Sequence, residues 1–516
     1  MKNIIDKGIG FISIYDTESY ALRILSAILN RGGYLSHQVY FKKLYSSNFP
    51  YTDKEVQILI DLLVKLKIKL LCVSLRSSSL KSFSLLVNII KRAFPELHIL
   101  IGGTHAILSP YDALKYADAI CVGEGEEVIL ETAKQYNGTI KSLTGIKDLW
   151  VKDDKETIVE SGKRGVFADL DSLPVEIYED DNKYLIENDI ISQGELLIES
   201  SWIESFASRG CPRQCTYCSN SELKKIIPLE KQKYVRIKSV NSVINDLVYL
   251  KNRFKRLKKI VFADEVFGLQ KEWVQEFCEV YPVKIGLPFS ALFYATLIDE
   301  EKISLLKSAG LSHGRIGIQS GSEDIRKNLY KRIETNEQII KAGKLFNKYG
   351  IRFTYDLIVN NPYETDTDKL ETLQLLAQIP RPFELNLHSL VYFPNTELTN
   401  KALLDGIIGS KEVEGENSCK GLFLTDVLSM WQGNDVFWNS LFSLTSKDFV
   451  PYKFILYLAK NKFFNNHKIL LLYLAKFATF IKMMQIGIHL IISREITLID
   501  AWKVFISLIF KPLTNK

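Results

Sequence analysis

Three cysteines crowd into eight positions of this 516-residue chain, in the run Cys211-Pro212-Arg213-Gln214-Cys215-Thr216-Tyr217-Cys218. Their spacing would let one loop wrap a cubane cluster, with each thiolate bound to one iron of a four-iron, four-sulfur centre. With only three cysteines, the fourth iron would have no local protein ligand. Because a catalytic metal centre requires an open coordination position, the spacing favours a catalytic iron–sulfur cluster.

A zinc site is the alternative interpretation of these thiols. Zinc usually takes a fourth Cys or His ligand, and the next candidates after Cys218 are Cys278 and His313, far along the chain. The remaining cysteines are scattered. We expect Cys72, Cys121, Cys278 and Cys419 to be small packing residues without chemistry.

The cysteine loop follows the first of six short apolar segments that we predict to be strands, at residues 203–208, 259–263, 289–292, 315–319, 353–359 and 385–390. Helical patterns separate them. Asp299 and Thr335 are suited to cap two of these helices, and Gly310 and Gly350 follow the same helices. Six consecutive βα units predict a partial (βα)6, TIM-like barrel over residues 199–408, in which chemistry gathers at the carboxyl ends of the strands.

An earlier βα series occupies residues 1–137, with predicted strands at 10–15, 35–41, 70–75, 98–102 and 118–123. The apolar runs are nearly continuous, as expected for a parallel sheet covered on both faces. They predict a doubly wound, Rossmann-like α/β domain, whose ligands bind beyond the carboxyl ends of the strands. The small residues at those ends would let a ligand approach the backbone, although they would also suit ordinary tight turns.

Two further segments complete the predicted organisation. Residues 138–198 break the βα rhythm and are predicted to be a linker that contains a hairpin around the turn at 153–156. Residues 409–516 are predicted to be mainly helical, basic and apolar.

The cysteine spacing at the end of a first barrel strand resembles the hallmark of radical S-adenosylmethionine (SAM) enzymes. Four later segments resemble other motifs of that family, in the same order and at strand ends: residues 259–265, 317–323, 361–365 and 393–398. The resemblance implies that Cys211, Cys215 and Cys218 bind a 4Fe-4S cluster. It also implies a set of SAM contacts, namely Tyr217, Ala263, Asp264, Glu265, Gln319 and Ser320. Gln319 departs from the usual Glu, but an amide oxygen can still accept a hydrogen bond, and Tyr363 replaces a turn glycine.

The N-terminal series is similar to the cobalamin-binding domain that precedes many radical SAM barrels. The resemblance implies cobalamin contacts at the strand ends, from Ser74, Ser77, Ser78, Gly102, Gly103, Thr104, Gly123 and Glu124. The D-x-H-x-x-G motif of classical cobalamin carriers is not found after the first strand, so no His from that position would bind the lower face of cobalt. We expect His105 to be a hydrogen-bonded turn residue.

Composition sets the class of protein. Hydrophobic residues make up 47% and charged residues 24% of the chain, which excludes disordered, collagen-like and disulfide-rich classes. The beginning of the chain has no signal-peptide pattern, so we expect a cytoplasmic protein. The net charge of +6 is concentrated near the end of the chain, since residues 447–516 hold 11 Lys or Arg against 3 Asp or Glu. The rest of the chain does not suggest a partner nucleic acid.

The apolar tail contains a predicted helix over residues 477–493. Polar residues form one stripe on it, namely Thr479, Lys482, Gln485, His489 and Ser493. Lys482 would lie near the centre of any span over 469–492, so a transmembrane helix is not expected. Packing on the barrel is the simplest role, and peripheral docking to a membrane is the alternative.

The resemblance implies a cobalamin-dependent radical SAM enzyme, in which a 5′-deoxyadenosyl radical abstracts hydrogen and methylcobalamin methylates the resulting carbon of a small molecule or lipid. An external electron donor would reduce the cluster. The alternatives are a radical SAM enzyme for cyclisation or oxidative rearrangement, a non-catalytic cobalamin or cluster sensor, and an RNA-modifying enzyme. The last is disfavoured because the chain lacks a second cysteine cluster.

Overall fold

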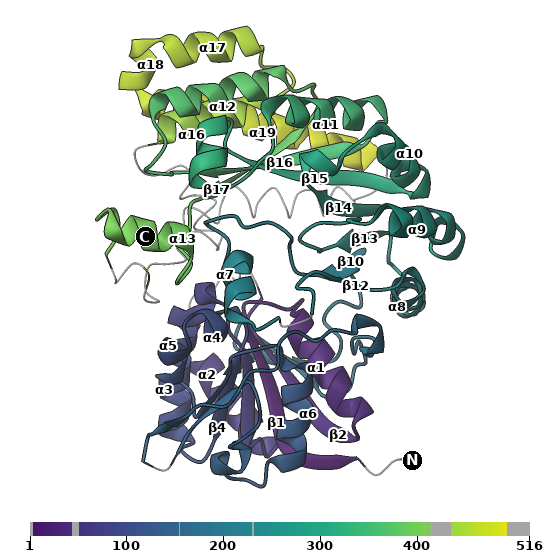
Figure 1. Cartoon of the computed structure of the whole chain (residues 1–516), viewed down its shortest axis with the longest axis vertical. Coiled ribbons are helices and arrows are strands. Elements are labelled where there is room, and N and C mark those ends of the chain that lie inside the picture. Colours follow the sequence, from purple (N-terminus) through teal and green to yellow (C-terminus); the bar gives the residue numbers. More distant parts are fainter. Residues whose placement is uncertain are drawn as a thin grey trace.

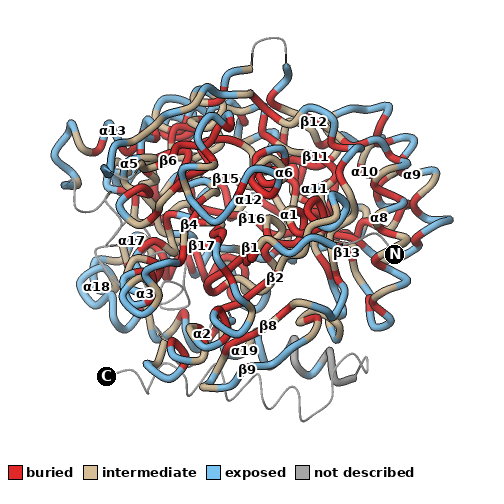
Figure 2. Tube along the Cα trace, turned by 90° about the horizontal axis from the view of Figure 1, so that it is seen from below, coloured by how far each residue is buried: buried red, intermediate tan, exposed pale blue. Residues whose placement is uncertain are grey.

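The computed structural model describes residues 4–43, 51–153, 155–229, 232–409, 413 and 435–492. Two α/β units and a set of C-terminal helices make up this part of the chain (Figure 1). The N-terminal unit forms one end of the molecule, and the second sheet with its helices forms the other. Strands are the most deeply buried elements, and the helices carry most of the exposed positions (Figure 2).

The N-terminal unit is built on a nine-stranded sheet in the order β7-β6-β5-β4-β3-β1-β2-β8-β9. Five parallel strands at its centre lie where the apolar runs predicted them: β1 (Ile5–Ile14), β2 (Tyr34–Phe41), β3 (Leu70–Ser74), β4 (His98–Gly102) and β5 (Ala119–Cys121). Short helices follow them: α1 (Tyr20–Arg31), α2 (Asp53–Lys65), α3 (Leu80–Ala93), α4 (Thr104–Leu108), α5 (Pro110–Leu114) and α6 (Gly125–Gln135). One core joins the sheet to α2 and α3, and another joins its other face to α1 and α6, so the sheet is doubly wound.

The segment at 138–198 contributes more to this sheet than a linker would. Its predicted hairpin is present as β6 (Leu149–Lys152) and β7 (Ile158–Val159), which extend one edge of the sheet in antiparallel fashion. A second hairpin, β8 (Lys183–Glu187) and β9 (Ile190–Gln193), extends the other edge through parallel pairing of β8 with β2. The limits of the domains stay a prediction.

The second unit is a six-stranded, all-parallel sheet in the order β10-β13-β14-β15-β16-β17, an open half-barrel. Its strands match the six predicted segments: β10 (Trp202–Ser205), β13 (Lys259–Phe262), β14 (Phe289–Phe293), β15 (Leu311–Gln319), β16 (Arg352–Val359) and β17 (Glu384–Ser389). The helices are α7 (Ser219–Ile226), α8 (Val240–Arg253), α9 (Lys271–Lys284), α10 (Glu300–Ala309), α11 (Asn336–Lys348), α12 (Asp366–Gln378) and α13 (Glu397–Leu404). A small antiparallel ladder pairs β11 (Ser208–Arg209), just before the cysteine loop, with β12 (Arg236–Ile237), after α7.

The predicted helix caps are present in the half-barrel. The Asp299 side chain accepts a hydrogen bond from the backbone of Lys302 at the start of α10, which ends at Gly310 with φ 113°. Thr335 forms a reciprocal capping box with Gln338 at the start of α11. These caps fix where each helix begins and therefore where the preceding strand-end loop must turn.

Charged side chains join the two units beside the cysteine loop. Arg209, in β11, donates to the Glu126 carboxylate at 2.6 Å and to the Tyr20 hydroxyl at 2.9 Å. Arg236, in β12, donates to both carboxylate oxygens of Glu124 at 2.7 and 2.8 Å. Both acidic residues follow β5, so the carboxyl edge of the N-terminal sheet faces the entrance to the half-barrel.

The C-terminal helices pack on the half-barrel. They are α16 (Val436–Thr445), α17 (Tyr452–Lys460), α18 (Lys462–Asn466) and α19 (Lys468–Ile492). Leu471, Ala475 and Ala478 of α19 belong to the barrel core cluster. No helix in the described ranges is both long and apolar enough to span a membrane.

Of the predicted polar stripe of this last helix, only Gln485 is exposed among the described side chains. Thr479 and Lys482 are half-buried, and they bond to the Ala475 carbonyl and to the Asp448 carboxylate at 2.8 and 2.5 Å. The side chains of His489 and Ser493 lie outside the described positions. Apolar side chains are exposed instead, because the small residues of α19 are the ones that fit against α16.

Candidate functional site

The cysteine loop connects β11 to α7 at the carboxyl side of the half-barrel. Cys211 and Cys215 are buried, and Cys218 is half-buried at the N-cap of α7. A cavity of about 90 Å³ lies beside Cys215 and Cys218. The loop thus presents its thiols at a sheltered strand end, as the resemblance implied.

Three hydrogen bonds fix the middle of this loop. The Thr216 amide donates to the Tyr330 carbonyl at 3.3 Å, and its hydroxyl donates to the Leu329 carbonyl at 2.5 Å. The Leu398 amide, at the start of α13, donates to the Thr216 carbonyl at 2.9 Å. The loop is therefore held by the segments that follow the fourth and sixth strands of the sheet, which is why these distant motifs accompany the cysteines.

Tyr294, at the end of β14, contacts the first cysteine directly. Its hydroxyl oxygen lies 2.9 Å from the Cys211 sulfur. The Arg213 guanidinium lies over its ring, 4.7 Å from the centroid, and donates to the Thr296 hydroxyl at 2.9 Å. Tyr294 therefore contacts the Arg213 guanidinium through its ring and the Cys211 thiol through its hydroxyl.

Arg332 is a second cation beside the loop, and its side chain is buried. One guanidinium nitrogen lies 3.9 Å from the Cys215 sulfur and 3.2 Å from the Tyr217 hydroxyl oxygen. The other donates to the Gly317 carbonyl at 2.8 Å and to the Glu334 carboxylate at 3.3 Å. Sequence reasoning missed Tyr294 and Arg332, since neither belongs to a spaced pattern, whereas the position of Arg213 inside the loop was a usable signal.

The thiols are suited to a multi-iron group. Burial raises the pKa of Cys218 to about 12 and also raises that of Cys211, so binding iron must displace protons. Among the described residues, no three Cys, His, Asp or Glu side chains converge on one point that could hold a single metal ion. A cubane separates its three thiolates onto different corners and does not require that convergence.

The side chain of Asp264, an implied SAM contact, is buried and bonds to the segment just before the cysteine loop. Its carboxylate accepts from the Ala207 amide at 3.1 Å and from the Ser208 hydroxyl at 2.5 Å. Burial raises the pKa of this carboxyl to about 7. In this arrangement Asp264 shapes the backbone that leads into the cysteine loop.

The other implied SAM contacts are spread along the strand ends. Glu265 is exposed and accepts a hydrogen bond at 3.0 Å from the side-chain amide of Asn220, which lies two residues after Cys218. Gln319 has φ 68°, in the left-handed region, and its amide folds over Gly317. The Ser320 hydroxyl donates to Glu364 at 2.6 Å. Ala263 follows β13, and Tyr217 packs edge-on against Tyr330.

A cavity of about 270 Å³ opens at the carboxyl edge of the N-terminal sheet. Six of the implied cobalamin contacts line it, namely Ser74, Gly102, Gly103, Thr104, Gly123 and Glu124. A side chain at Gly103 would lie 2.8 Å from the Leu75 carbonyl oxygen, so a glycine is required there. Arg209, two residues before Cys211 in the chain, lines the same cavity with its side chain.

Two implied cobalamin contacts lie elsewhere. Ser77 is buried, and its hydroxyl oxygen lies 2.9 Å from the Nδ1 of His105; neither Ser77 nor Ser78 lines the cavity. The Nε2 of His105 lies 3.2 Å from the Asp112 carboxylate, so both ring nitrogens are engaged within the fold. Cys72 and Cys121 are buried and Cys278 is half-buried, whereas Cys419 lies outside the described residues.

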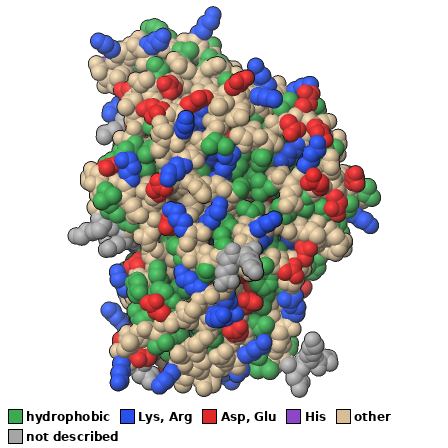
Figure 3. Space-filling model, viewed as in Figure 1, with side chains coloured by type: hydrophobic (Ala, Val, Ile, Leu, Met, Phe, Trp, Pro, Cys, Tyr) green, Lys and Arg blue, Asp and Glu red, His purple; other side chains and the backbone are tan. Residues whose placement is uncertain are grey.

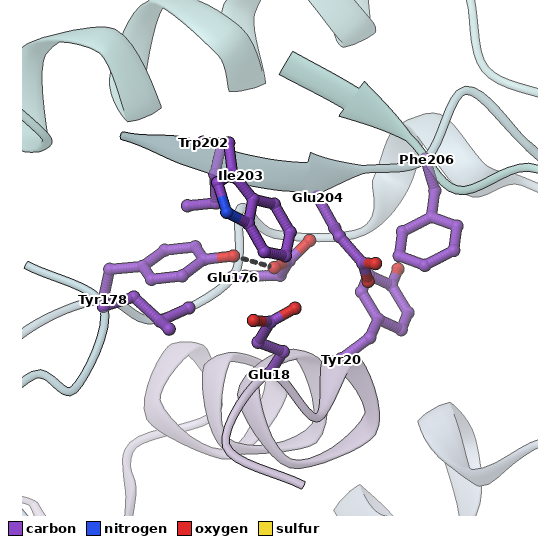
Figure 4. A pocket seen from close by; sticks show the side chains of 9 residues that line it. Glu18, Tyr20, Glu176, Tyr178, Trp202, Ile203, Glu204 and Phe206 are labelled. Atoms are coloured by element: carbon purple, nitrogen blue, oxygen red, sulfur yellow. Dashed lines mark hydrogen bonds between the residues drawn. The ribbon is translucent and has the colours of Figure 1, made fainter. Parts of the chain in front are cut away.

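A second, smaller pocket lies where β10 meets the N-terminal unit (Figure 4). Carboxyl groups of Glu18, Glu176 and Glu204 lie around it, and its aromatic walls are Tyr20, Tyr178, Trp202 and Phe206. Burial, together with the neighbouring carboxylates Glu204 and Asp16, raises the pKa of Glu18 to about 7. Burial also raises the pKa of Glu176 to about 7, although the Tyr178 hydroxyl donates to it at 2.5 Å.

Comparison with known proteins identifies the half-barrel. Residues 206–376 match the model of the radical SAM superfamily. The chain is 24% identical over 327 residues to an uncharacterised methyltransferase of Pyrococcus horikoshii, covering 62% of this chain and 66% of that one. It is 21% identical over 369 residues to cytidylyl-2-hydroxyethylphosphonate methyltransferase of Streptomyces wedmorensis, covering 66% of this chain and 67% of that one. The match thus spans about two thirds of the length of these curated relatives.

Two solved structures share the fold of both units. The radical SAM methyltransferase TsrM of Kitasatospora setae, solved with tryptophan and a SAM analogue, aligns with a TM-score of 0.61 at 15% identity, over 77% of this chain and 76% of that chain. The cobalamin-dependent radical SAM enzyme OxsB, solved with aqua-cobalamin and SAM, aligns with a TM-score of 0.60 at 16% identity, over 94% and 75%. The α/β architecture, an open parallel half-barrel preceded by a Rossmann-like unit, is therefore shared with these two enzymes.

Proposed function

We propose that the protein is a cobalamin-dependent radical SAM methyltransferase, on the premise that residues 206–376 match the model of the radical SAM superfamily. One observation carries the proposal: Arg209 lines the cavity of the N-terminal sheet and lies two residues before Cys211 of the cysteine loop. The two places where cofactors would bind are therefore adjacent. This adjacency favours methyl transfer over a sensor that needs only one of them.

The proposal assigns the thiols of Cys211, Cys215 and Cys218 to a 4Fe-4S cluster. The cluster and SAM, when bound, would supply a 5′-deoxyadenosyl radical, and methylcobalamin would supply the methyl group. Arg332 and Arg213 place positive charge beside these thiols, which suits an anionic cluster. Tyr217, Ala263, Glu265, Gln319 and Ser320 are the proposed SAM contacts, and Asp264 is proposed to support them through the loop backbone.

Cobalamin is proposed to bind at the cavity of the N-terminal sheet. Ser74, Gly102, Gly103, Thr104 and Gly123 would contact it through small side chains and backbone groups. Glu124 lines the cavity, but its carboxylate is already held by Arg236, so it is proposed to form the wall.

The substrate is proposed to be a small molecule. TsrM was solved with tryptophan, and the S. wedmorensis relative is named for a nucleotide-linked phosphonate. Neither resemblance favours a nucleic acid. An external electron donor would reduce the cluster.

The test is anaerobic reconstitution with iron, sulfide and cobalamin, followed by addition of reductant and SAM. We expect 5′-deoxyadenosine and S-adenosylhomocysteine, both detected by mass spectrometry. The Cys218→Ala variant should lose both products, whereas Cys278→Ala, at a half-buried thiol in α9, should keep them. Deoxyadenosine alone would favour cyclisation or rearrangement, and equal yields from both variants would contradict the cluster assignment.

We further propose that the C-terminal helices dock on an anionic membrane surface. Nearly half of the exposed large apolar side chains in the described residues lie on this short region: Phe449, Phe454, Tyr457, Phe463, Ile469, Leu470, Tyr473, Phe477, Phe480, Met483, Met484 and Ile488. On α19 they recur every three or four residues along one face. Residues 449–492 hold six lysines and no acidic residue, a charge pattern complementary to anionic headgroups. In Figure 3, Lys and Arg side chains project from the end of the molecule that α17 and α18 form.

Vesicle flotation of the full chain tests this docking. We expect binding to phosphatidylglycerol vesicles and little binding to phosphatidylcholine vesicles. The double variant Tyr473→Glu/Phe477→Glu should lose it, whereas Val283→Glu, at another highly exposed apolar position, should not. Flotation that is equal for both variants, or a wild-type dimer that the double variant dissociates, would contradict membrane docking.

A further inference from the structure

Polar side chains line the concave face of the half-barrel. Ile316 and Ile318 of β15 belong to the core beneath the helices, so the alternate residues of that strand face the other side. The polar residues on that face of β15, β16 and β17 are His313, Arg315, Thr354, Asp356, Glu384, Asn386 and His388. Neither the cysteine loop nor the N-terminal cavity uses them.

Four of these side chains form one connected group. The Arg315 Nε donates to Asp356 at 2.6 Å, and the Asn386 amide donates to the other carboxylate oxygen at 3.0 Å. The His388 Nε2 lies 3.5 Å from Asp356 and 3.4 Å from an Arg315 nitrogen. The Asp356 side chain is 7% exposed, whereas those of Arg315 and His388 are 43% and 52% exposed.

The difference in exposure between buried Asp356 and half-exposed Arg315 determines what this group can bind. Asp356 is occupied by three partners and fixes the inner edge of the Arg315 guanidinium. The Arg315 side chain remains 43% exposed, and the planar donors of a guanidinium match a carboxylate or a phosphate. The ring of His388 borders the same space.

This group lies close to the cysteine loop. Gly317 accepts a hydrogen bond from Arg332, which also contacts Cys215. Arg315 lies two residues earlier on the same face of β15, about 7 Å along the strand. A small molecule anchored at Arg315 would therefore extend toward the cysteine loop.

Charge on this part of the lumen also favours an anion. The cations on the concave side of β13 to β17 are Lys259, Arg315 and Arg352, and the anions are Asp356 and Glu384, which gives 3 − 2 = +1 with neutral histidines. The acidic pocket with Glu204 is on β10, at the opposite edge of the sheet.

We propose that Arg315 and His388 form a subsite for an anionic group of the substrate, a carboxylate or a phosphate. This inference rests on the proposed function and adds the class of substrate to it. It requires no cofactor to be bound, so it can be tested by binding alone.

The experiment is calorimetric titration of the full-length protein with benzoate, phenyl phosphate and the neutral analogue benzamide, without reductant. We expect one or both anions to bind at least tenfold more tightly than benzamide. Arg315→Gln should abolish that preference, and Arg315→Lys should restore part of it. Arg352→Gln, which removes a lumen-side cation outside the connected group, should keep it.

Each outcome of the titration either supports or overturns the anion subsite. Preference for benzoate identifies a carboxylate substrate, and preference for phenyl phosphate identifies a phosphate substrate. Equal binding of benzamide, no binding at all, or a preference that survives Arg315→Gln would overturn the subsite. Anion binding by a protein that cleaves no SAM would disprove the proposed function and leave the subsite standing.

Discussion

Two guanidinium groups surround the thiols of the cysteine loop, and they act through different contacts. Arg213 stacks on Tyr294, whose hydroxyl contacts Cys211, whereas Arg332 approaches Cys215 directly. Hydrogen bonds to cluster sulfurs stabilise the more negative, reduced form and raise the reduction potential. The potential of a bound cluster should therefore depend on Arg332.

Replacing Arg332 with Lys tests this dependence. A lysine keeps the charge but loses the planar fork that reaches Cys215, Tyr217 and Gly317 at once. We expect the reduction potential of the reconstituted cluster to fall, measured by a redox titration followed by electron paramagnetic resonance. Arg236→Lys is the matched control because the guanidinium of Arg236 bonds to the Glu124 carboxylate and the Phe167 carbonyl and not to a cysteine sulfur. An unchanged potential in Arg332→Lys would show that this contact has no electrostatic role.

The carboxyl group of Glu176 gives a pH-dependent prediction. Its folded pKa is about 7, raised by burial from the ordinary value of 4.5, so the folded state holds a proton that the unfolded state releases. Stability should then fall as pH rises from about 4.5 to about 7. Glu176→Gln removes this loss, and its melting temperature relative to wild type should rise between pH 5 and pH 8. Glu276→Gln, at an exposed position of α9, should show the same difference at both pH values, and the prediction fails if Glu176→Gln does too.

At the residue scale, the sequence is informative where spacing along the chain places side chains together. The three cysteines are consecutive on one loop, so their proximity follows from the chain itself. Tyr294 and Arg332 reach the same loop from segments roughly 80 and 115 residues away, and only the fold brings them there. Asp264 shows the converse, because a residue at the expected strand end turns its side chain toward the backbone of the neighbouring strand.

At the scale of elements, glycines in the loops determine how closely two backbone segments can approach each other. Gly103 has φ 93°, and a Cβ there would lie 2.8 Å from the carbonyl oxygen of Leu75. Gly138 has φ 100°, but a Cβ there would meet nothing within 4 Å. The two positions share the backbone strain of a positive φ and differ only in the clash.

We therefore expect Gly103→Ala to destabilise the protein by about 1–3 kcal/mol more than Gly138→Ala, because only Gly103→Ala forces backbone apart. Chemical denaturation measures the difference. Cobalamin affinity, followed by absorbance, should also fall only in Gly103→Ala, since Gly103 lines the cavity. Equal losses of stability would mean that the loop relaxes without cost.

Strands and helices could be predicted where the hydrophobic pattern in the sequence was strong. All eleven strands predicted from apolar runs in the two βα series are present, because buried parallel strands are continuously apolar. Hairpin β8–β9 was missed for two reasons. Strand β9 is fully exposed, and the pairing of β8 with β2 joins segments far apart in the sequence. The sequence predicted the polar stripe of α19 but not which side of the helix is covered, since helical periodicity locates a stripe and not the neighbour that packs on it.

At the scale of the whole molecule, charged contacts couple the N-terminal sheet to the half-barrel. Glu124 and Glu126 follow β5, and their partners Arg236 and Arg209 flank the cysteine loop. The Phe167 amide also donates to Glu124 at 2.5 Å. These contacts could not be predicted, because each partner alone looks like an ordinary charged residue.

The pair Glu124–Arg236 should contribute measurably to the attachment of the two units. Its side chains are 20% and 7% exposed and share two hydrogen bonds, so the contact is little screened by solvent. A double-mutant cycle with Glu124→Gln and Arg236→Met should give a coupling energy of about 1.5–3 kcal/mol. The exposed pair Glu199–Arg256 should give about 0.2–1 kcal/mol and lose most of it in high salt. If the two cycles gave the same coupling, the charged contacts would not hold the units together, and apolar contacts such as Tyr20 against Phe206 would have to position the N-terminal cavity over the cysteine loop.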